Sequence, residues 1–243
     1  MTVKAIIFDK DGTLLDFDAF WLTVSKNAIN EILKEISRQD IPTEKILSAL
    51  GVKNDITDIN GVLCRGTYSQ IAQEMYNTLI KYGCVCTFDD IEKRTIDAYH
   101  RNSDKGIVKA TCDNICDVIT GLKNMGIKLA VVTTDDPFVT QKCLQLLNID
   151  KLFDIIYTDD GKLPTKPDPY CIYDLCERYG ITTSDVIMVG DTVTDMNFAK
   201  NGGIKAIGVA KNENNKAILI ENHAYIVIPD ISYVFDVLKE DNL

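Results

Sequence analysis

Residues 5–14 read Ala5-Ile6-Ile7-Phe8-Asp9-Lys10-Asp11-Gly12-Thr13-Leu14, a short apolar run followed at once by a charged turn. The run from Ala5 to Phe8 shows no alternation of apolar and polar residues, which predicts a strand buried on both faces. Alternation along the extended chain would place Asp9 and Asp11 on one side and Lys10 on the other. Because open α/β sheets bind ligands at the carboxyl ends of their strands, this stretch predicts both a sheet and the place of its site.

Five further apolar runs have the same unalternated character. They are Leu129 to Val132, Ile155 to Tyr157, Val186 to Val189, Ala206 to Val209 and Tyr225 to Ile228. Helical patterns lie between them, and two of these patterns end at Gly126 and Gly180, as helices commonly do. Strands that alternate with helices predict an α/β fold with a doubly wound parallel sheet.

Residues 16–106 interrupt this alternation, because they contain helical signals and no convincing strand. Helices are expected at Phe20 to Ser37, Thr43 to Leu50, Tyr68 to Tyr82 and Asp89 to Asn102. We therefore predict a smaller, all-helical cap domain at 16–106, inserted into a core that consists of residues 1–15 and 107–243.

The composition restricts the partners and the compartment. A net charge of −10 and a pI near 4.7 argue against nucleic acid or an anionic membrane as the partner, since both need clustered Lys and Arg. No apolar run reaches the roughly eighteen residues of a membrane helix, and the chain reaches the charged cluster Asp9-Lys10-Asp11 within nine residues of Met1. We therefore expect neither a membrane span nor a signal peptide. Eight scattered cysteines and only two histidines disfavour a zinc site and favour reduced thiols in a cytoplasmic protein. The sequence carries no signal of oligomeric state.

A second acidic cluster, Gly190-Asp191-Thr192-Val193-Thr194-Asp195, follows another buried run. Neighbouring parallel strands would bring its two carboxylates to the first pair, and four carboxylates repel one another unless a cation neutralises them. Oxygen ligands without paired Cys or His favour Mg²⁺ over zinc. The alternative for this cluster alone is an ordinary helix N-terminus capped by Thr194 or Asp195.

Two further expected strand or helix ends offer groups that suit a phosphate. Thr133 closes the run that ends at Val132, so its hydroxyl and the amide of Thr134 can bind a phosphoryl oxygen. Lys166, in Lys166-Pro167-Asp168-Pro169, precedes a predicted helix and offers positive charge. Each of these residues alone also has an ordinary structural explanation.

In order and spacing, these four motifs resemble those of the haloacid dehalogenase superfamily, in its phosphatase branch, and the resemblance covers nearly the whole chain. It implies a Rossmann-like core and hydrolysis of a small phosphorylated metabolite, a phosphate monoester, with phosphoglycolate phosphatase as the nearest analogy. It also implies that Asp9 attacks phosphorus and that Asp11 protonates the leaving oxygen and then activates water. Thr133 would orient the phosphoryl group, and Lys166 would neutralise it.

The resemblance further implies a Mg²⁺ site formed by Asp9, the backbone carbonyl of Asp11 and Asp191, with Asp195 as a ligand or as the partner of one. In relatives with such a cap, a cap loop reads the rest of the substrate. The glycine-flanked turn from Asn60 to Thr67 makes Arg65 a candidate contact for a substrate carboxylate or second phosphate, and a solvated loop arginine is the alternative.

The sequence departs from the family's pattern at two places. Lys10 stands where an apolar residue is usual, and Thr134-Asp135-Asp136 stands where an Asn commonly follows the motif threonine. We expect Lys10 to face away from the site. Two alternatives stay open: a sugar-phosphate mutase like β-phosphoglucomutase, a class that tends to lose the aspartate preserved here as Asp195, and a non-catalytic phosphate-binding module on the same fold.

Overall fold

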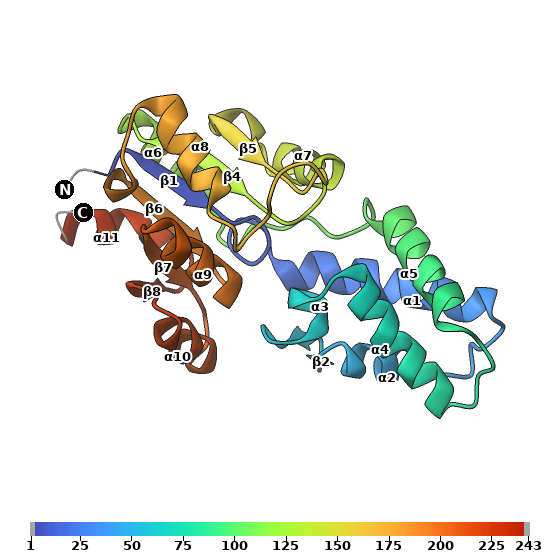
Figure 1. The fold of residues 1–243 in the computed structure, drawn as a ribbon. Coiled ribbons are helices and arrows are strands. Elements are labelled where there is room, and N and C mark those ends of the chain that lie inside the picture. The colour runs from blue at the N-terminus through green and yellow to red at the C-terminus, as the bar shows by residue number, and fades with distance from the viewer. Residues whose placement is uncertain (1–2, 241–243) are drawn as a thin grey trace. The chain divides into compact units, whose positions relative to one another are not determined.

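The computed structural model describes residues 3–240 and contains two compact units, Met1–Asp16 with Val108–Leu243, and Phe17–Ile107. The first unit holds a six-stranded parallel sheet in the order β5-β4-β1-β6-β7-β8 (Figure 1). Its strands are β1 (Ala5–Phe8), β4 (Lys128–Val132), β5 (Ile155–Tyr157), β6 (Val186–Gly190), β7 (Lys205–Val209) and β8 (Ile226–Ile228). The predicted α/β fold with a parallel sheet is confirmed, and each of the six apolar runs forms one of these strands.

The strand order places β1 between β4 and β6 and makes β1 the point at which the chain's winding reverses. Phe8 of β1 pairs with Val131 of β4 and with Val189 of β6, so the three strands end at nearly the same level. The residues that follow them include Asp9 and Asp191. Ligands of open α/β sheets bind outside such a reversal point, which directs attention to these three loops.

Helices cover the sheet because its strands are apolar on both faces. Ile7, Val132 and Met188 share one buried cluster with residues of α8, α9 and α10, and α6 packs against β4. The helices of this unit are α6 (Ile115–Asn124), α7 (Pro137–Leu146), α8 (Tyr170–Tyr179), α9 (Val193–Gly202), α10 (Glu213–Glu221) and α11 (Val234–Glu240), with short 3₁₀ turns at Asp150–Leu152, Thr183–Asp185 and Ile231–Tyr233.

The second unit consists mainly of helices packed around α1, α4 and α5. Its elements are a π-helical turn (Asp18–Leu22), α1 (Thr23–Glu35), α2 (Thr43–Ala49), α3 (Val62–Arg65), α4 (Tyr68–Lys81) and α5 (Phe88–Asn102). Buried Tyr99 of α5 donates to Ser25 of α1 at 3.0 Å, and Arg94 of α5 pairs with Glu35 at 2.6 Å.

The expectation that this region contains no strand is wrong. Two short antiparallel strands, β2 (Val52–Lys53) and β3 (Ile56–Thr57), form a hairpin that turns at Asn54 and Asp55, both with positive φ. A two-residue strand is too short to show the alternation from which strands are predicted. Within residues 3–240, no helix combines the length and the hydrophobicity that a membrane crossing requires.

Candidate active site

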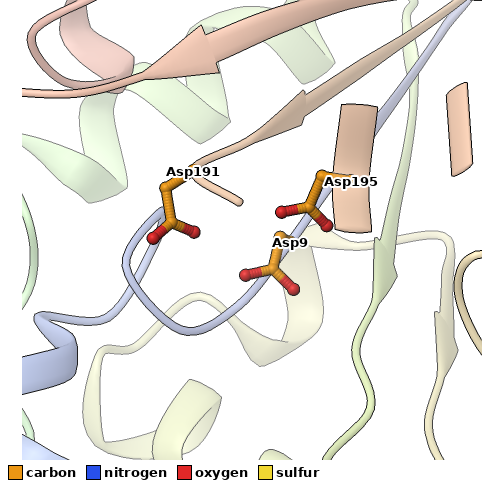
Figure 2. Close-up of side chains that lie close together, drawn as sticks. All are labelled: Asp9, Asp191 and Asp195. Carbon is orange, nitrogen blue, oxygen red and sulfur yellow. The ribbon is translucent and has the colours of Figure 1, made fainter. Parts of the chain in front are cut away.

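Three aspartates meet at the carboxyl ends of β1 and β6. Asp9 follows β1, and its amide donates to the carbonyl of Val189 at 2.9 Å. Asp191 follows β6, and Asp195 lies in the first turn of α9. One carboxylate oxygen from each lies within 4.8 Å of the others, and Figure 2 shows the three groups side by side. No other set of His, Cys, Asp and Glu side chains in the described part of the chain is grouped in this way.

The turn after β1 shapes the wall of this cluster. Gly12 has φ of +84°, and a Cβ at this position would lie 2.0 Å from Oδ2 of Asp191. A side chain here would therefore collide with the cluster as well as strain the backbone. Thr13, the next residue, donates its hydroxyl to Oδ1 of Asp191 at 3.2 Å. Gly12 thus leaves the space that the carboxylate of Asp191 occupies, and Thr13 holds that carboxylate by a hydrogen bond.

Lys166 supplies positive charge inside the cluster. Its Nζ donates to Oδ1 of Asp9 at 2.5 Å and to Oδ1 of Asp195 at 2.6 Å, and its side chain is only 3 % exposed. Burial alone would lower the pKa of Lys166, but the carboxylates of Asp195 and Asp9 outweigh burial and raise it, so the ammonium stays charged.

Asp195 uses both of its carboxylate oxygens in protein contacts. Oδ1 accepts from Lys166, and Oδ2 accepts from the amide and the hydroxyl of Thr192 at 3.0 and 2.7 Å. Thr192 in turn caps α9 by accepting from the amide of Asp195 at 3.3 Å. The expected helix N-terminus therefore exists. Its N-cap is Thr192; of the two predicted capping residues, Asp195 takes part in the capping box through its carboxylate, and Thr194 is not the cap.

The cluster holds more negative than positive charge. Three ionised carboxylates and one ammonium leave a formal charge of −2. Burial, with smaller contributions from nearby Asp195 and Asp11, raises the pKa of Asp9 to about 7 against the opposing effect of Lys166. Burial and the charge of Asp9 likewise raise the pKa of Asp191 well above its usual value. Because a divalent cation would balance this charge and oxygen ligands suit Mg²⁺, the residues present fit that ion.

The expectation that Lys10 faces away from the site is wrong, because its ammonium contacts the predicted acid, Asp11. Its side chain is fully buried, and its Nζ lies 2.6 Å from Oδ1 of Asp11 and 3.0 Å from Oδ2 of Asp135. Strand alternation fixes the direction of the Cα–Cβ bond, whereas the four-carbon stem of a lysine lets the ammonium bend back to its neighbour. Lys10 therefore contacts the side chain from which it was expected to point away.

The other predicted residues lie in three different surroundings. Thr133 is buried at the end of β4, where its amide donates to the carbonyl of Tyr157 at 3.1 Å and its hydroxyl accepts from the amide of Asp135 at 3.2 Å. Thr134 is exposed. Arg65 ends α3 in the helical unit, is exposed, and donates to Asn60 at 2.7 Å.

Sequence reasoning missed three residues that touch the cluster or its surroundings, namely Thr13, Thr192 and Asp135 as the partner of Lys10. The contact of Thr192 could have been found, because Thr192-x-x-Asp195 has the spacing of a capping box. The contacts of Thr13 and Asp135 depend on how two loops fold against each other, which no local pattern encodes.

Comparison with known proteins places the chain among hydrolases. The model of the haloacid dehalogenase-like hydrolases matches residues 3–203. The phosphoglycolate phosphatase of Nitrosospira multiformis is 26 % identical over 233 residues, which cover 95 % of this chain and 93 % of that protein. A pyrophosphatase of Bacillus mycoides is 21 % identical over 242 residues, with 100 % of both chains covered. A solved structure from Haemophilus somnus, described as a "predicted phosphoglycolate phosphatase", has a TM-score of 0.73 at 22 % identity and covers 98 % of this chain and 99 % of its own.

Proposed function

Because the chain belongs to the haloacid dehalogenase-like hydrolase family, we propose that it is a phosphatase that hydrolyses small phosphate monoesters with the help of Mg²⁺. The observation that carries the proposal is the contact of Lys166 with both Asp9 and Asp195, beside Asp191. A carboxylate nucleophile, a neutralising ammonium and oxygen ligands for a divalent cation thus meet at one edge of the sheet. This combination suits phosphoryl transfer, because catalysis of that reaction consists mainly of positioning and of neutralising negative charge.

In the proposed reaction, a carboxylate oxygen of Asp9 attacks phosphorus, and the bond between phosphorus and the leaving oxygen breaks. Asp11 gives its proton to that leaving oxygen. In the second half, Asp11 takes a proton from a water molecule, which attacks the phosphorus of the aspartyl-phosphate and releases Asp9 and inorganic phosphate. The hydroxyl of Thr133 and the amide of Thr134 orient the phosphoryl oxygens.

We propose that Asp9, Asp191 and the backbone carbonyl of Asp11 hold Mg²⁺, which when bound offsets negative charge on the phosphoryl group. Because both carboxylate oxygens of Asp195 already accept hydrogen bonds from Lys166 and Thr192, we assign Asp195 the role of holding Lys166 in place. Lys166 in turn neutralises the phosphoryl group.

The relatives suggest two candidate substrates, namely phosphoglycolate, which is a phosphate monoester, and pyrophosphate, which is a phosphoric anhydride and would extend the proposal beyond monoesters. Each carries a second anionic group beside the phosphate that would be transferred. We propose that the helical unit Phe17–Ile107 acts as a cap and that Arg65 contacts this second group. Arg65→Gln should then raise the KM for phosphoglycolate more than the KM for p-nitrophenyl phosphate, which lacks such a group, and an equal change in both would contradict this role.

The proposed activity is tested by measuring inorganic phosphate released from p-nitrophenyl phosphate, phosphoglycolate, pyrophosphate and a set of sugar phosphates, with Mg²⁺ or with EDTA. Turnover should require Mg²⁺ and should be absent in Asp9→Asn. Asp117→Asn, at an exposed position on α6, removes a carboxylate elsewhere and should leave turnover unchanged.

The covalent step has its own readout. Acid quenching during turnover should leave phosphate on the native chain and none on Asp9→Asn, and hydroxylamine should release it, since acyl phosphates react with hydroxylamine. If the native chain shows no Mg²⁺-dependent turnover above Asp9→Asn on any substrate, the proposal fails. Conversion of a sugar phosphate into its isomer without release of phosphate would identify a mutase instead.

A further inference from the structure

A chain of buried charges lies next to the proposed acid. The amide of Asp136 donates to Oδ1 of Asp135 at 2.8 Å, and Oδ2 of Asp135 lies 3.0 Å from Nζ of Lys10. Nζ of Lys10 donates to Oδ1 of Asp11 at 2.6 Å. The side chains of Lys10, Asp135 and Asp11 are 0, 8 and 16 % exposed. The two places at which the sequence departs from the family's pattern are thus in contact with each other.

Stability alone gives little reason for this arrangement. A buried ion pair loses so much hydration that apolar residues of similar volume often stabilise a protein equally well. Burial alone would lower the pKa of Lys10, but Asp11 and Asp135 outweigh burial and raise it, so the buried ammonium stays charged. The buried ammonium of Lys10, which is costly to desolvate, thus contacts Asp11. The proposed role of Asp11 is to give one proton to the leaving oxygen, and that role requires a defined orientation of its carboxyl group.

Lys10 contacts both carboxylates from one buried position. Its Nζ donates to Oδ1 of Asp11 at 2.6 Å and forms an ion pair with Oδ2 of Asp135 at 3.0 Å. Since β1 and β4 are neighbours in the sheet, Lys10 ties the loop that follows β1 to the loop that follows β4.

We propose that Lys10, anchored by Asp135, is the positioning residue of Asp11 and holds its carboxyl group in the orientation from which it protonates the leaving oxygen. This inference rests on the proposed function, in which Asp11 is the general acid. With one oxygen of Asp11 fixed by Lys10, proton transfer uses the other oxygen, and the carboxyl group is spared a search among rotamers.

The inference predicts a change in selectivity between leaving groups. An alkoxide is a poor leaving group and needs the proton of the acid, whereas p-nitrophenolate leaves without one. A misplaced Asp11 should therefore slow the reaction of an alkyl phosphate far more than that of p-nitrophenyl phosphate. A general loss of folding or of Mg²⁺ would slow both reactions alike.

The experiment measures kcat/KM for an alkyl phosphate that the native chain hydrolyses and for p-nitrophenyl phosphate, in Lys10→Met and in the double variant Lys10→Met with Asp135→Asn. This parameter reports the phosphorylation of Asp9, the step in which the leaving group departs. In both variants the alkyl-to-aryl ratio should fall at least about tenfold, as a part of the roughly 10²- to 10⁴-fold that a general acid contributes.

The double variant separates positioning from simple neutralisation. If Lys10 served only to neutralise Asp135, removing both charges together would restore the native ratio, and that result overturns the proposal. An unchanged ratio in Lys10→Met overturns it as well. Because the double variant leaves no unpaired charge at Asp135, it keeps the test valid if the single variant folds poorly.

Two further variants complete the comparison. Lys4→Met makes the same substitution at the opposite end of β1, where Lys4 is 55 % exposed and pairs with Asp185 at 3.2 Å, and its ratio should equal the native one. Asp11→Asn defines the full loss of the acid. If Asp11→Asn leaves the ratio unchanged, the proposed role of Asp11 fails; if the ratio falls in Asp11→Asn but not in Lys10→Met, only the positioning role fails.

Discussion

Replacing Asp9 by asparagine should stabilise the metal-free protein at pH 8, although it removes the proposed nucleophile. The pKa of Asp9 rises from 3.8 to about 7 in the folded chain, mainly through burial and against the effect of Lys166. Because the folded pKa lies above the unfolded one, the folded state binds more protons between these values, and its stability falls as the pH rises through this window. The destabilisation is complete above the folded pKa and is absent below the unfolded one.

The size of the effect follows from the shift. One pKa unit corresponds to about 1.4 kcal/mol, so the shift of Asp9 costs the folded state about 4 kcal/mol at pH 8 and less than about 2 kcal/mol at pH 5. Relative to Asp9→Asn, the native chain should therefore lose about 3 kcal/mol of unfolding free energy between pH 5 and pH 8. Lys166 retains Asp195 as a partner in the variant, so no buried ammonium is left unpaired.

The assay is urea unfolding followed by circular dichroism, in EDTA, at several pH values from 5 to 8. The difference in unfolding free energy between Asp9→Asn and the native chain should grow with pH. Saturating Mg²⁺ should restore the stability of the native chain at pH 8, because a bound ligand stabilises the folded state. Asp117→Asn, the surface control, should show no such trend. If the difference in unfolding free energy between the native chain and Asp9→Asn stays constant from pH 5 to pH 8, the raised pKa of Asp9 does not destabilise the folded state and the prediction is wrong.

Two further substitutions probe the walls of the site, each with a matched control. Gly12→Ala should weaken Mg²⁺ binding at least about tenfold in a calorimetric titration, because its Cβ would lie 2.0 Å from Oδ2 of Asp191. Gly126→Ala has a similar φ of +80° with nothing within 4 Å, so it should lose only about 1 kcal/mol of stability, and equal Mg²⁺ affinities would contradict the steric argument. Thr192→Val should cost about 1 kcal/mol through the lost cap of α9 and should also lower kcat/KM. Thr87→Val removes the corresponding cap of α5 and should match the stability loss with kcat/KM unchanged; a similar fall in kcat/KM would argue against a specific role for Thr192.

The sheet was predictable because its strands are buried on both faces. Such strands appear in the sequence as short unbroken apolar runs, and each run became one parallel strand. The β2–β3 hairpin was not predictable in this way, since its strands have only two residues each. The one-turn helix α3 (Val62–Arg65) lies in a stretch that had been expected to form a turn, because four residues are too few to show a helical period.

For the site, the carboxyl ends of strands were a sufficient guide to the convergence of Asp9 and Asp191, because β1 and β6 are neighbours. The partners of Lys10 were beyond sequence reasoning, since alternation describes backbone directions and a long side chain can reverse them. Its buried partner Asp135 follows β4, at a distance in sequence that no local pattern spans.

The two chain segments that connect the helical unit to the sheet unit are hydrogen-bonded to each other within the sheet unit. Leu15 and Ala110 form an antiparallel bridge, and the amide of Asp16 donates to the carbonyl of Lys109 at 2.8 Å. A segment whose two ends are held side by side adds little closure entropy to the unit that it interrupts. We therefore expect the sheet unit to tolerate a change in the stretch Phe17–Ile107: a few glycines that join Asp16 to Val108 in its place should leave the sheet unit folded.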